Sequence, residues 1–208
     1  MRTHQTSLTG RRVLITGAAR GIGAALAERL HERGARVALA GLEPDLLAQA
    51  AAKAGAPWWH CDVADRASVE AAVDAAVGEL GGLDVVVANA GIAAQLPLVG
   101  GDPEVFEQIN RVNVLGAYYT LRAAGPHISH PNGYAVAVSS LGAAVSVPLM
   151  GAYSASKAAV EALGNTLRAE LAPSGARVGV AYFAELDTDM TSRGFGTEAA
   201  KSIFGDGT

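Results

Sequence analysis

The sequence predicts an α/β fold, a Rossmann-type doubly wound parallel sheet of six or seven strands with helices on both faces. Six short apolar runs alternate with longer segments of helical spacing. The runs are continuously apolar, as expected for parallel strands that are covered on both faces. A glycine-rich segment also joins the first run to the first helical segment, so the chain begins as strand, loop, helix and strand.

The first half of the chain contains four of the predicted strands. Gly34 ends the first helical segment, and Pro44 suits the first turn of the second. Val69, Val73 and Val77 recur every four residues and indicate a third helix. These signals predict strands at Arg12–Thr16, Arg36–Ala40, Pro57–Cys61 and Asp84–Ala88, and helices at Ala24–Arg33, Glu43–Ala54 and Asp65–Leu80.

The second half continues the alternation with two longer helices. A turn over residues 100–103 precedes the first of them, and the second is rich in alanine and leucine. We expect helices at Glu104–Ala124 and Tyr153–Leu171, and strands at Tyr134–Val138 and Arg177–Phe183. Since no linker, repeat or low-complexity tract interrupts the pattern, residues 1–208 are expected to form a single domain.

Composition restricts the class of protein. Half of the 208 residues are apolar, 17% are charged and the net charge is −4, which argues against disorder and against nucleic-acid binding. Cys61 is the only cysteine, which suits a reducing compartment. The first ten residues lack the apolar core of a signal peptide, and no apolar run is long enough to span a membrane. We therefore expect a soluble protein of the cytoplasm.

The segment from Gly17 to Gly23 is typical of a loop that binds the pyrophosphate of a dinucleotide. Its glycines permit a tight turn and a close approach of the backbone to the pyrophosphate. The helix that follows would point its unpaired N–H groups and positive dipole end at the same anion. An ordinary strand-to-helix turn is the alternative interpretation.

Polar residues follow the ends of the predicted strands. In an open α/β sheet this carboxyl edge is where ligands bind. A solvated loop explains any one of these residues, but the whole set predicts a ligand-binding edge. The residues are Thr16, Asp62, Asn89, Ser140 and Thr188.

Tyr153 and Lys157 form a pair suited to proton transfer. They stand four residues apart in a predicted helix, and such positions share one face. A neighbouring cation favours the phenolate and lowers the pKa of a tyrosine, which would bring it closer to neutrality. Taken alone, the spacing more often marks a packed ring beside a solvated amine.

Together these motifs resemble the common form of the short-chain dehydrogenase/reductase family, over nearly the whole chain. Ser140 and Tyr153 stand 13 residues apart, which is the family spacing. The other matching motifs are Thr16–Gly23 for TGxxxGIG, Asn89–Gly91 for NAG, Asn113 for the helix asparagine, and Tyr153–Lys157 for YxxxK.

The resemblance implies a catalytic role for four of these residues. Tyr153 would be the general acid and base, and Ser140 would polarise the substrate oxygen. Lys157 would hold the nicotinamide ribose and lower the pKa of Tyr153, and Asn113 would order a water that links Lys157 to bulk solvent. The same resemblance implies cofactor contacts from Gly17, Ala19, Arg20, Gly21, Ile22, Gly23, Asp62, Val63, Asn89, Ala90, Gly91, Tyr153, Lys157, Leu186 and Thr188.

Structural roles remain open for several of these residues. Ser140 and Asp62 also suit turn capping, Asn113 suits a buried amide, and Thr188 suits a helix N-cap. Cys61 is interpreted as strand packing. The five histidines lack ligand spacing, so no metal is expected.

The sequence departs from the family at three places. Phe183 and Ala184 replace the usual Pro-Gly after the last strand, which changes the loop over the nicotinamide. Gly41 stands where NAD-preferring members carry an acid, and Arg20 could pair with a 2′-phosphate, so NADP(H) is slightly favoured over NAD(H). Glu43 would oppose that phosphate if it turned inward. Third, family members usually continue with a covering segment and a seventh strand, whereas residues 191–208 are polar and contain no strand-like run; we expect either a minimal covering segment or a truncated chain.

We expect an oxidoreductase that interconverts a small apolar secondary alcohol and a ketone, as a homodimer or homotetramer. Two alternatives stay open: a dinucleotide-binding redox sensor or truncated inactive member, and a lyase or epimerase on the same fold. The predicted substrate wall consists of Leu96, Leu98, Val145, Val147, Leu149, Met150 and Phe183.

Overall fold

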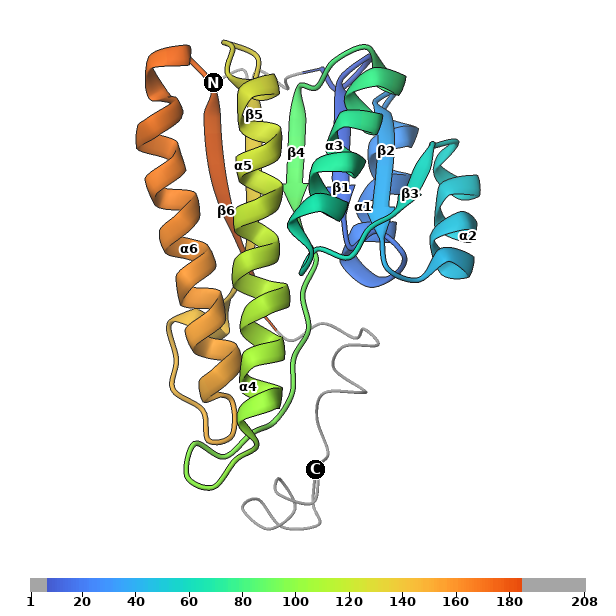
Figure 1. The fold of residues 1–208 in the computed structure, drawn as a ribbon. Coiled ribbons are helices and arrows are strands. Elements are labelled where there is room, and N and C mark those ends of the chain that lie inside the picture. The colour runs from blue at the N-terminus through green and yellow to red at the C-terminus, as the bar shows by residue number, and fades with distance from the viewer. Residues whose placement is uncertain (1–6, 185–208) are drawn as a thin grey trace.

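The computed structural model describes residues 7–184 and places one parallel sheet between two layers of helices (Figure 1). The strand order is β3-β2-β1-β4-β5-β6, and every neighbouring pair is parallel. This confirms the predicted Rossmann-type fold with six strands in the described residues. The strands are β1 (Arg12–Thr16), β2 (Arg36–Gly41), β3 (Trp58–His60), β4 (Val85–Ala88), β5 (Tyr134–Ser140) and β6 (Arg177–Phe183).

The helices begin and end at recognisable signals. Asp65 and Asp102 each accept a hydrogen bond, 2.9 Å long, from a backbone N–H in the first turn of the helix that follows. Gly55 and Gly81 end two helices in the left-handed conformation. The helices are α1 (Gly21–Glu32), α2 (Pro44–Ala54), α3 (Arg66–Leu80), α4 (Pro103–Asn110), α5 (Gly116–Ile128) and α6 (Gly151–Leu171), with short turns η1 (Arg111–Leu115), η2 (Leu141–Ala143) and η3 (Ala172–Ser174).

Two cores lie on opposite faces of the sheet because side chains alternate along each strand. On β1, Val13 and Ile15 pack with α1 and α2, whereas Leu14 packs with α3, α5 and α6. Both faces of the central strands are thus buried. This burial is the reason that the strands appear in the sequence as unbroken apolar runs.

The prediction of one regular helix over residues 104–124 is wrong. The structure has α4, then the π-helical turn η1, then α5, which continues to Ile128 with Pro126 in its last turn. A π turn inserts one extra residue into a helix and changes the direction of its side chains. Here it coincides with Asn113, whose side chain is fixed by other elements of the fold.

Strand ends also differ slightly from the prediction. β5 includes Ser139 and Ser140, because these residues pair with Tyr182 and Phe183 at the end of β6. Helix α1 begins at Gly21, so the glycine loop passes directly into its first turn. Both differences extend regular structure toward the carboxyl edge of the sheet and so fix the residues there more firmly.

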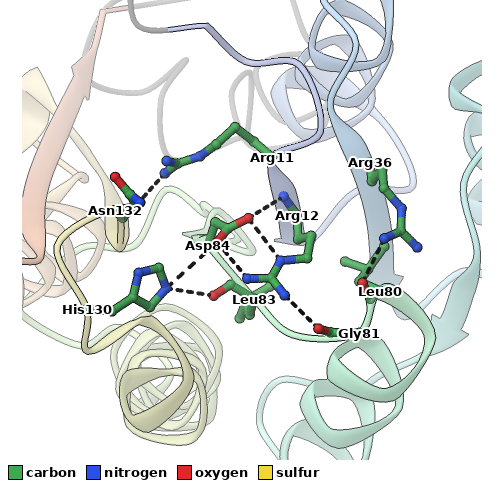
Figure 2. A network of polar contacts seen from close by, with 9 residues as sticks. All are labelled: Arg11, Arg12, Arg36, Leu80, Gly81, Leu83, Asp84, His130 and Asn132. Carbon is green, nitrogen blue, oxygen red and sulfur yellow. Dashed lines mark hydrogen bonds and ion pairs between the residues drawn. The ribbon is translucent and has the colours of Figure 1, made fainter.

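A network of hydrogen bonds and ion pairs lies at the opposite edge of the sheet, where the strands begin (Figure 2). The Asp84 carboxylate accepts hydrogen bonds from the Arg12 backbone N–H at 2.9 Å and from its guanidinium at 2.8 and 3.0 Å. The same guanidinium donates to the Gly81 carbonyl oxygen at the end of α3 (2.6 Å). These bonds lower the pKa of Asp84 to about 2. The network joins β1, α3 and the start of β4.

No helix within residues 7–184 combines the length and apolar character needed to cross a membrane. The predicted contacts of Leu186 and Thr188 lie outside the described residues.

Candidate active site

The glycine loop between β1 and α1 turns tightly at the carboxyl edge of the sheet. Gly17 and Gly21 have φ angles of 64° and 54°, which residues with side chains rarely adopt. A Cβ atom on Gly17 would lie 2.6 Å from the Ala90 Cα, and one on Gly23 would lie 2.7 Å from the Asn89 Nδ2. The loop therefore exposes backbone, not side chains, at the N-terminus of α1, and it fits a dinucleotide pyrophosphate.

Asn89, Ala90 and Gly91 follow β4 and lie against this loop. Asn89 Nδ2 donates to the carbonyl oxygens of Thr16 at 3.0 Å and Gly17 at 3.1 Å. The Thr16 hydroxyl accepts from the Asn89 backbone N–H at 3.2 Å. These bonds join β1 to β4 where the strand order reverses, which is the switch point at which open α/β sheets bind ligands.

Asp62 and Val63 lie just past β3, further along the same edge. Asp62 Oδ1 accepts from the Ala64 backbone N–H at 2.9 Å, which is the turn-capping bond that the sequence left open. Val63 is buried, and a Cβ on Gly116 would lie 2.8 Å from its Cγ2. The loop after β3 is therefore held tightly against α5.

Ser140 ends β5 with its hydroxyl held by two backbone groups. The Oγ atom accepts from the Gly142 N–H at 3.0 Å and donates to the Phe183 carbonyl oxygen at 3.3 Å. Tyr153 lies beside it: a Cβ on Gly142 would be 3.3 Å from the Ser140 Oγ and 3.4 Å from the Tyr153 ring. The structure thus brings Ser140 and Tyr153 together from β5 and α6.

Tyr153 and Lys157 lie one turn apart on α6. The Lys157 Nζ is 5.8 Å from the centre of the Tyr153 ring and donates to the Val138 carbonyl oxygen at 3.0 Å. Lys157 is only 3% exposed, and burial lowers its pKa to about 8. Burial raises the pKa of Tyr153, and a hydrogen bond with the Ser140 side chain only partly offsets this.

The direction for Tyr153 is opposite to the lowering expected from the sequence. The spacing of Tyr153 and Lys157 indicates a charge beside the phenol but does not reveal the loss of water around it. Removing a phenolate from water favours the neutral form, and this effect dominates here.

Asn113 lies in the π turn and is almost fully buried. Its Oδ1 accepts from the Ile92 N–H at 2.8 Å, and its Nδ2 donates to the Ile92 carbonyl oxygen and to the Ser156 hydroxyl, both at 2.9 Å. A Cβ on Gly91 would lie 3.2 Å from both the Asn113 Oδ1 and the Lys157 Nζ. Asn113 and Lys157 therefore face one small space beside Gly91.

Ile92 and Ser156, which were not among the predicted site residues, also take part in this arrangement. Ser156 also donates to the Tyr153 carbonyl oxygen at 2.7 Å and so connects Asn113 to the start of α6. Its place between Tyr153 and Lys157 was the available signal. No comparable signal marks Ile92, because only its backbone takes part.

The predicted substrate wall is divided between buried and exposed side chains. Leu96 and Leu149 are buried, and the Leu96 N–H donates to the Leu149 carbonyl oxygen at 2.7 Å, which joins two loops. Leu98 is exposed and packs over Gly151. Val145 and Val147 are exposed, whereas Met150 and Phe183 are half-buried.

The adenosine end of the expected cofactor site contains a pair of opposite charges. Arg20 Nη2 lies 3.1 Å from Glu43 Oε1. In the glycine loop and the first turn of α1, Ala19 is buried, Ile22 is half-buried and Gly21 is exposed to solvent. Within residues 7–184, no group of three His, Cys, Asp or Glu side chains could hold a metal ion.

A sheet of order 3-2-1-4-5-6 with a glycine loop at its switch point defines the class of Rossmann-fold dinucleotide-binding proteins. The sequence matches the short chain dehydrogenase family over residues 11–206. That match covers most of the chain, which belongs to the short-chain dehydrogenase family.

Characterised relatives agree with this assignment. The chain is 36% identical over 177 residues to D-threitol dehydrogenase of Mycolicibacterium smegmatis, covering 82% of this chain and 68% of that protein. It is 36% identical over 172 residues to L-2,3-butanediol dehydrogenase of Corynebacterium glutamicum, covering 78% and 66%. The chain thus spans about two thirds of the length of these two relatives.

Solved structures give the same result. NAD+-bound xylitol dehydrogenase superposes with a TM-score of 0.82 at 31% identity, covering 85% of this chain and 71% of that one. A short chain dehydrogenase from Burkholderia cenocepacia in complex with NADP gives a TM-score of 0.84 at 34% identity, covering 88% and 78%. Structural neighbours therefore include proteins bound to either nicotinamide dinucleotide.

Proposed function

We propose that this chain is an NAD(P)-dependent oxidoreductase that interconverts a secondary alcohol and a ketone, with Tyr153 as general acid and base. The proposal rests mainly on the meeting of Ser140, Tyr153 and Lys157 next to the glycine loop. The names of the relatives support it, because they are dehydrogenases of threitol, 2,3-butanediol and xylitol.

Tyr153 transfers the proton in this proposal. In reduction it donates its phenolic proton to the substrate oxygen, and burial, which raises its pKa, keeps that proton in place at neutral pH. In oxidation Tyr153 starts as the phenolate, which the nearby ammonium of Lys157 favours, and it becomes the phenol when it accepts the proton of the substrate hydroxyl. The nicotinamide, when bound, supplies or accepts the hydride.

Ser140 holds and polarises the substrate oxygen. Because its Oγ accepts from the Gly142 N–H, the hydroxyl proton remains available for donation. That proton points to the Phe183 carbonyl oxygen in a long bond of 3.3 Å, which a substrate oxygen can replace. A preorganised donor of this kind stabilises negative charge as it develops on the substrate oxygen.

Lys157 and Asn113 serve the proton supply. Lys157 holds the nicotinamide ribose, and Asn113 orders the water that links Lys157 to bulk solvent. The shared space beside Gly91 supports this assignment, because a side chain there would come within 3.2 Å of both groups. The buried bonds of Asn113 to Ile92 and Ser156 keep that space open.

The dinucleotide binds across the switch point, with NADP(H) slightly preferred over NAD(H). The absence of an acid at Gly41 and the presence of Arg20 support this preference. The residues proposed to contact the cofactor are Gly17, Ala19, Arg20, Gly21, Ile22, Gly23, Asp62, Val63, Asn89, Ala90, Gly91, Tyr153, Lys157, Leu186 and Thr188.

A small apolar alcohol or ketone is the proposed substrate, since Leu96 and Leu149 meet beside the start of α6 and exposed apolar side chains surround them. We further propose that the protein acts as a homodimer or homotetramer in the cytoplasm. Gel filtration with light scattering would measure the oligomeric state, and a monomeric mass would contradict this last proposal.

Turnover of a panel of small ketones with NADPH and NADH tests the function. With wild-type protein, the nicotinamide absorbance should fall as NADPH or NADH is oxidised. Tyr153→Phe should still bind the cofactor, but its kcat should be about 10²–10⁴-fold lower. Turnover of a substrate without any change in nicotinamide absorbance would identify a lyase or epimerase instead. Cofactor binding without turnover of any substrate would identify a sensor.

A further inference from the structure

Ser139 places a buried hydroxyl group between β5 and α6. Side chains alternate along a strand, so Ala135, Ala137 and Ser139 share one face of β5. The two alanines pack there in the same core as Val160 of α6. These small side chains let the helix lie close to the strand. Ser139 alone among the three carries a group that can form a hydrogen bond across the contact.

Two hydrogen bonds of opposite direction join this end of β5 to Lys157. The Ser139 hydroxyl donates to the Lys157 carbonyl oxygen at 2.9 Å, whereas the Lys157 Nζ donates to the Val138 carbonyl oxygen at 3.0 Å. β5 runs past the end of β4 here, because the last pair between these strands is Ala88 with Ala137. One bond thus fixes the backbone of Lys157, and the other fixes the end of its side chain.

The bond to Val138 matters because an ammonium group is costly to bury. Lys157 is almost fully buried, and burial lowers its pKa to about 8. A carbonyl acceptor favours the charged form and so opposes this effect. The carbonyl can do so only while the turn of α6 that carries Lys157 keeps its position along β5. The Ser139 hydroxyl bonds to that same turn.

We propose that Ser139 is a positioning residue, whose hydroxyl fixes the turn of α6 that carries Lys157 and so keeps the ammonium on the Val138 carbonyl oxygen, facing Tyr153. This inference rests on the proposed function and deepens it, because Tyr153 depends on that charge in oxidation. The other groups that face the ammonium are the Tyr153 ring on α6, which titrates, and the Asn113 side chain on η1, which does not.

Ser139→Thr and Ser139→Val form a matched pair, since their side chains have nearly the same shape and only threonine keeps the hydroxyl. Ser139→Ala removes the hydroxyl without adding volume, and it replaces the valine variant if that one does not fold. Lys157 stays buried in all three, whereas loss of the hydroxyl weakens the bond that favours its ammonium. Its pKa should therefore fall by about 0.5–1 in the valine and alanine variants and stay at the wild-type value in Ser139→Thr.

Nuclear magnetic resonance of protein labelled with carbon-13 at the lysine Cε measures this pKa without any turnover. The sequence holds three lysines, so Lys53→Arg and Lys201→Arg assign the remaining signal to Lys157. The control is Thr120→Val, which removes a buried hydroxyl bond of the same kind, 2.8 Å long, to the Gly116 carbonyl oxygen in α5. It should lower the Tm but leave the pKa of Lys157 unchanged.

The pH profile of alcohol oxidation supplies a second measurement. At pH 8, the expected fall in the pKa of Lys157 leaves about two- to fivefold fewer chains with the ammonium. The kcat of Ser139→Val should be lower by the same factor at pH 8, and the pH above which kcat declines should move down. Ser139→Thr should restore both, which a loss of general stability would not explain.

The outcomes separate this inference from the proposed function. A lower pKa of Lys157 in Ser139→Val and Ser139→Ala, restored in Ser139→Thr, supports the inference. Equal pKa values in Ser139→Thr and Ser139→Val overturn it, and the proposed function then stands or falls by turnover alone. If the resonance result is as expected but wild type turns over no alcohol or ketone, the proposed function fails, while the placement of Lys157 by Ser139 is still supported.

Discussion

The ammonium nitrogen of Lys157 lies 5.8 Å from the centre of the Tyr153 ring, within the protein interior. The position suits proton transfer, but it removes a cation from water. Burial lowers the pKa of Lys157 to about 8 from an ordinary value of 10.5. The same placement that serves the site therefore opposes folding at neutral pH.

Replacing Lys157 with methionine should stabilise the fold and abolish turnover. Between about pH 8 and 10.5 the unfolded chain binds the proton more tightly than the folded one, so wild-type stability should rise with pH in this range. Lys157→Met should have a higher Tm than wild type at pH 7. Its stability should not show the rise with pH that the wild type shows above about pH 8. Thermal unfolding from pH 6 to 10 checks both; a lower Tm for the variant at pH 7 would contradict the account.

Asp84 should stabilise the protein in the opposite pH range. Its pKa is lowered from 3.8 to about 2, mainly by the hydrogen bond from the Arg12 side chain, so its contribution is present above about pH 4 and is lost as pH falls to 2 (Figure 2). Asp84→Asn should reduce the free energy of unfolding at pH 7 by about 1–2 kcal/mol.

Urea unfolding at pH 7 and pH 3 measures this loss. The control is Glu107→Gln, which removes an exposed ion pair with Arg111 and should change stability by less than about 0.5 kcal/mol. Equal losses for the two variants would mean that the Arg12–Asp84 network adds no more than a solvated pair.

Gly164 permits the close approach of α6 to the sheet. A Cβ at this position would lie 2.6 Å from the Val180 Cγ2 and 3.2 Å from the Ala137 Cβ. Gly164→Ala should therefore destabilise the fold by about 1–3 kcal/mol. Gly78→Ala on α3 is the matched control, because nothing lies within 4 Å of its Cβ; it should stabilise by up to about 1 kcal/mol. Chemical unfolding of both variants decides whether the signs are opposite.

Leu149 should show the signature of backbone strain. It is the one non-glycine residue among residues 7–184 with a positive φ, at 66°, and it precedes the start of α6 by two residues. Glycine adopts this conformation freely, so Leu149→Gly should be more stable than Leu149→Ala by about 1 kcal/mol, the reverse of the usual order. Differential scanning calorimetry compares them, and a more stable alanine variant would show that the strain is absent.

Local sequence sufficed to predict the sheet because its strands are central and buried. The run at Val85–Ala88, for example, has neighbours on both edges and helices on both faces, so every position is apolar. The glycine loop was equally predictable, since a positive φ at Gly17 and its contact with Ala90 each exclude side chains.

Features that depend on distant residues were not predictable. No glycine or proline within residues 111–115 signals the π turn; its position coincides with the bonds of Asn113 to Ile92 and Ser156. The Arg12–Asp84 network joins residues 72 positions apart and follows no motif. The pKa direction of Tyr153 also depends on burial, which spacing along the chain does not reveal.

Transfer of deuterium from labelled NADPH to a ketone tests the central claim most directly. The label is placed on the reactive carbon of the nicotinamide, and the product from a ketone panel is analysed by mass spectrometry. The account predicts an alcohol that carries the deuterium with wild type, and none with Tyr153→Phe although that variant still binds NADPH. If wild type binds NADPH and no ketone gains deuterium, Tyr153 does not serve alcohol–ketone chemistry in this chain.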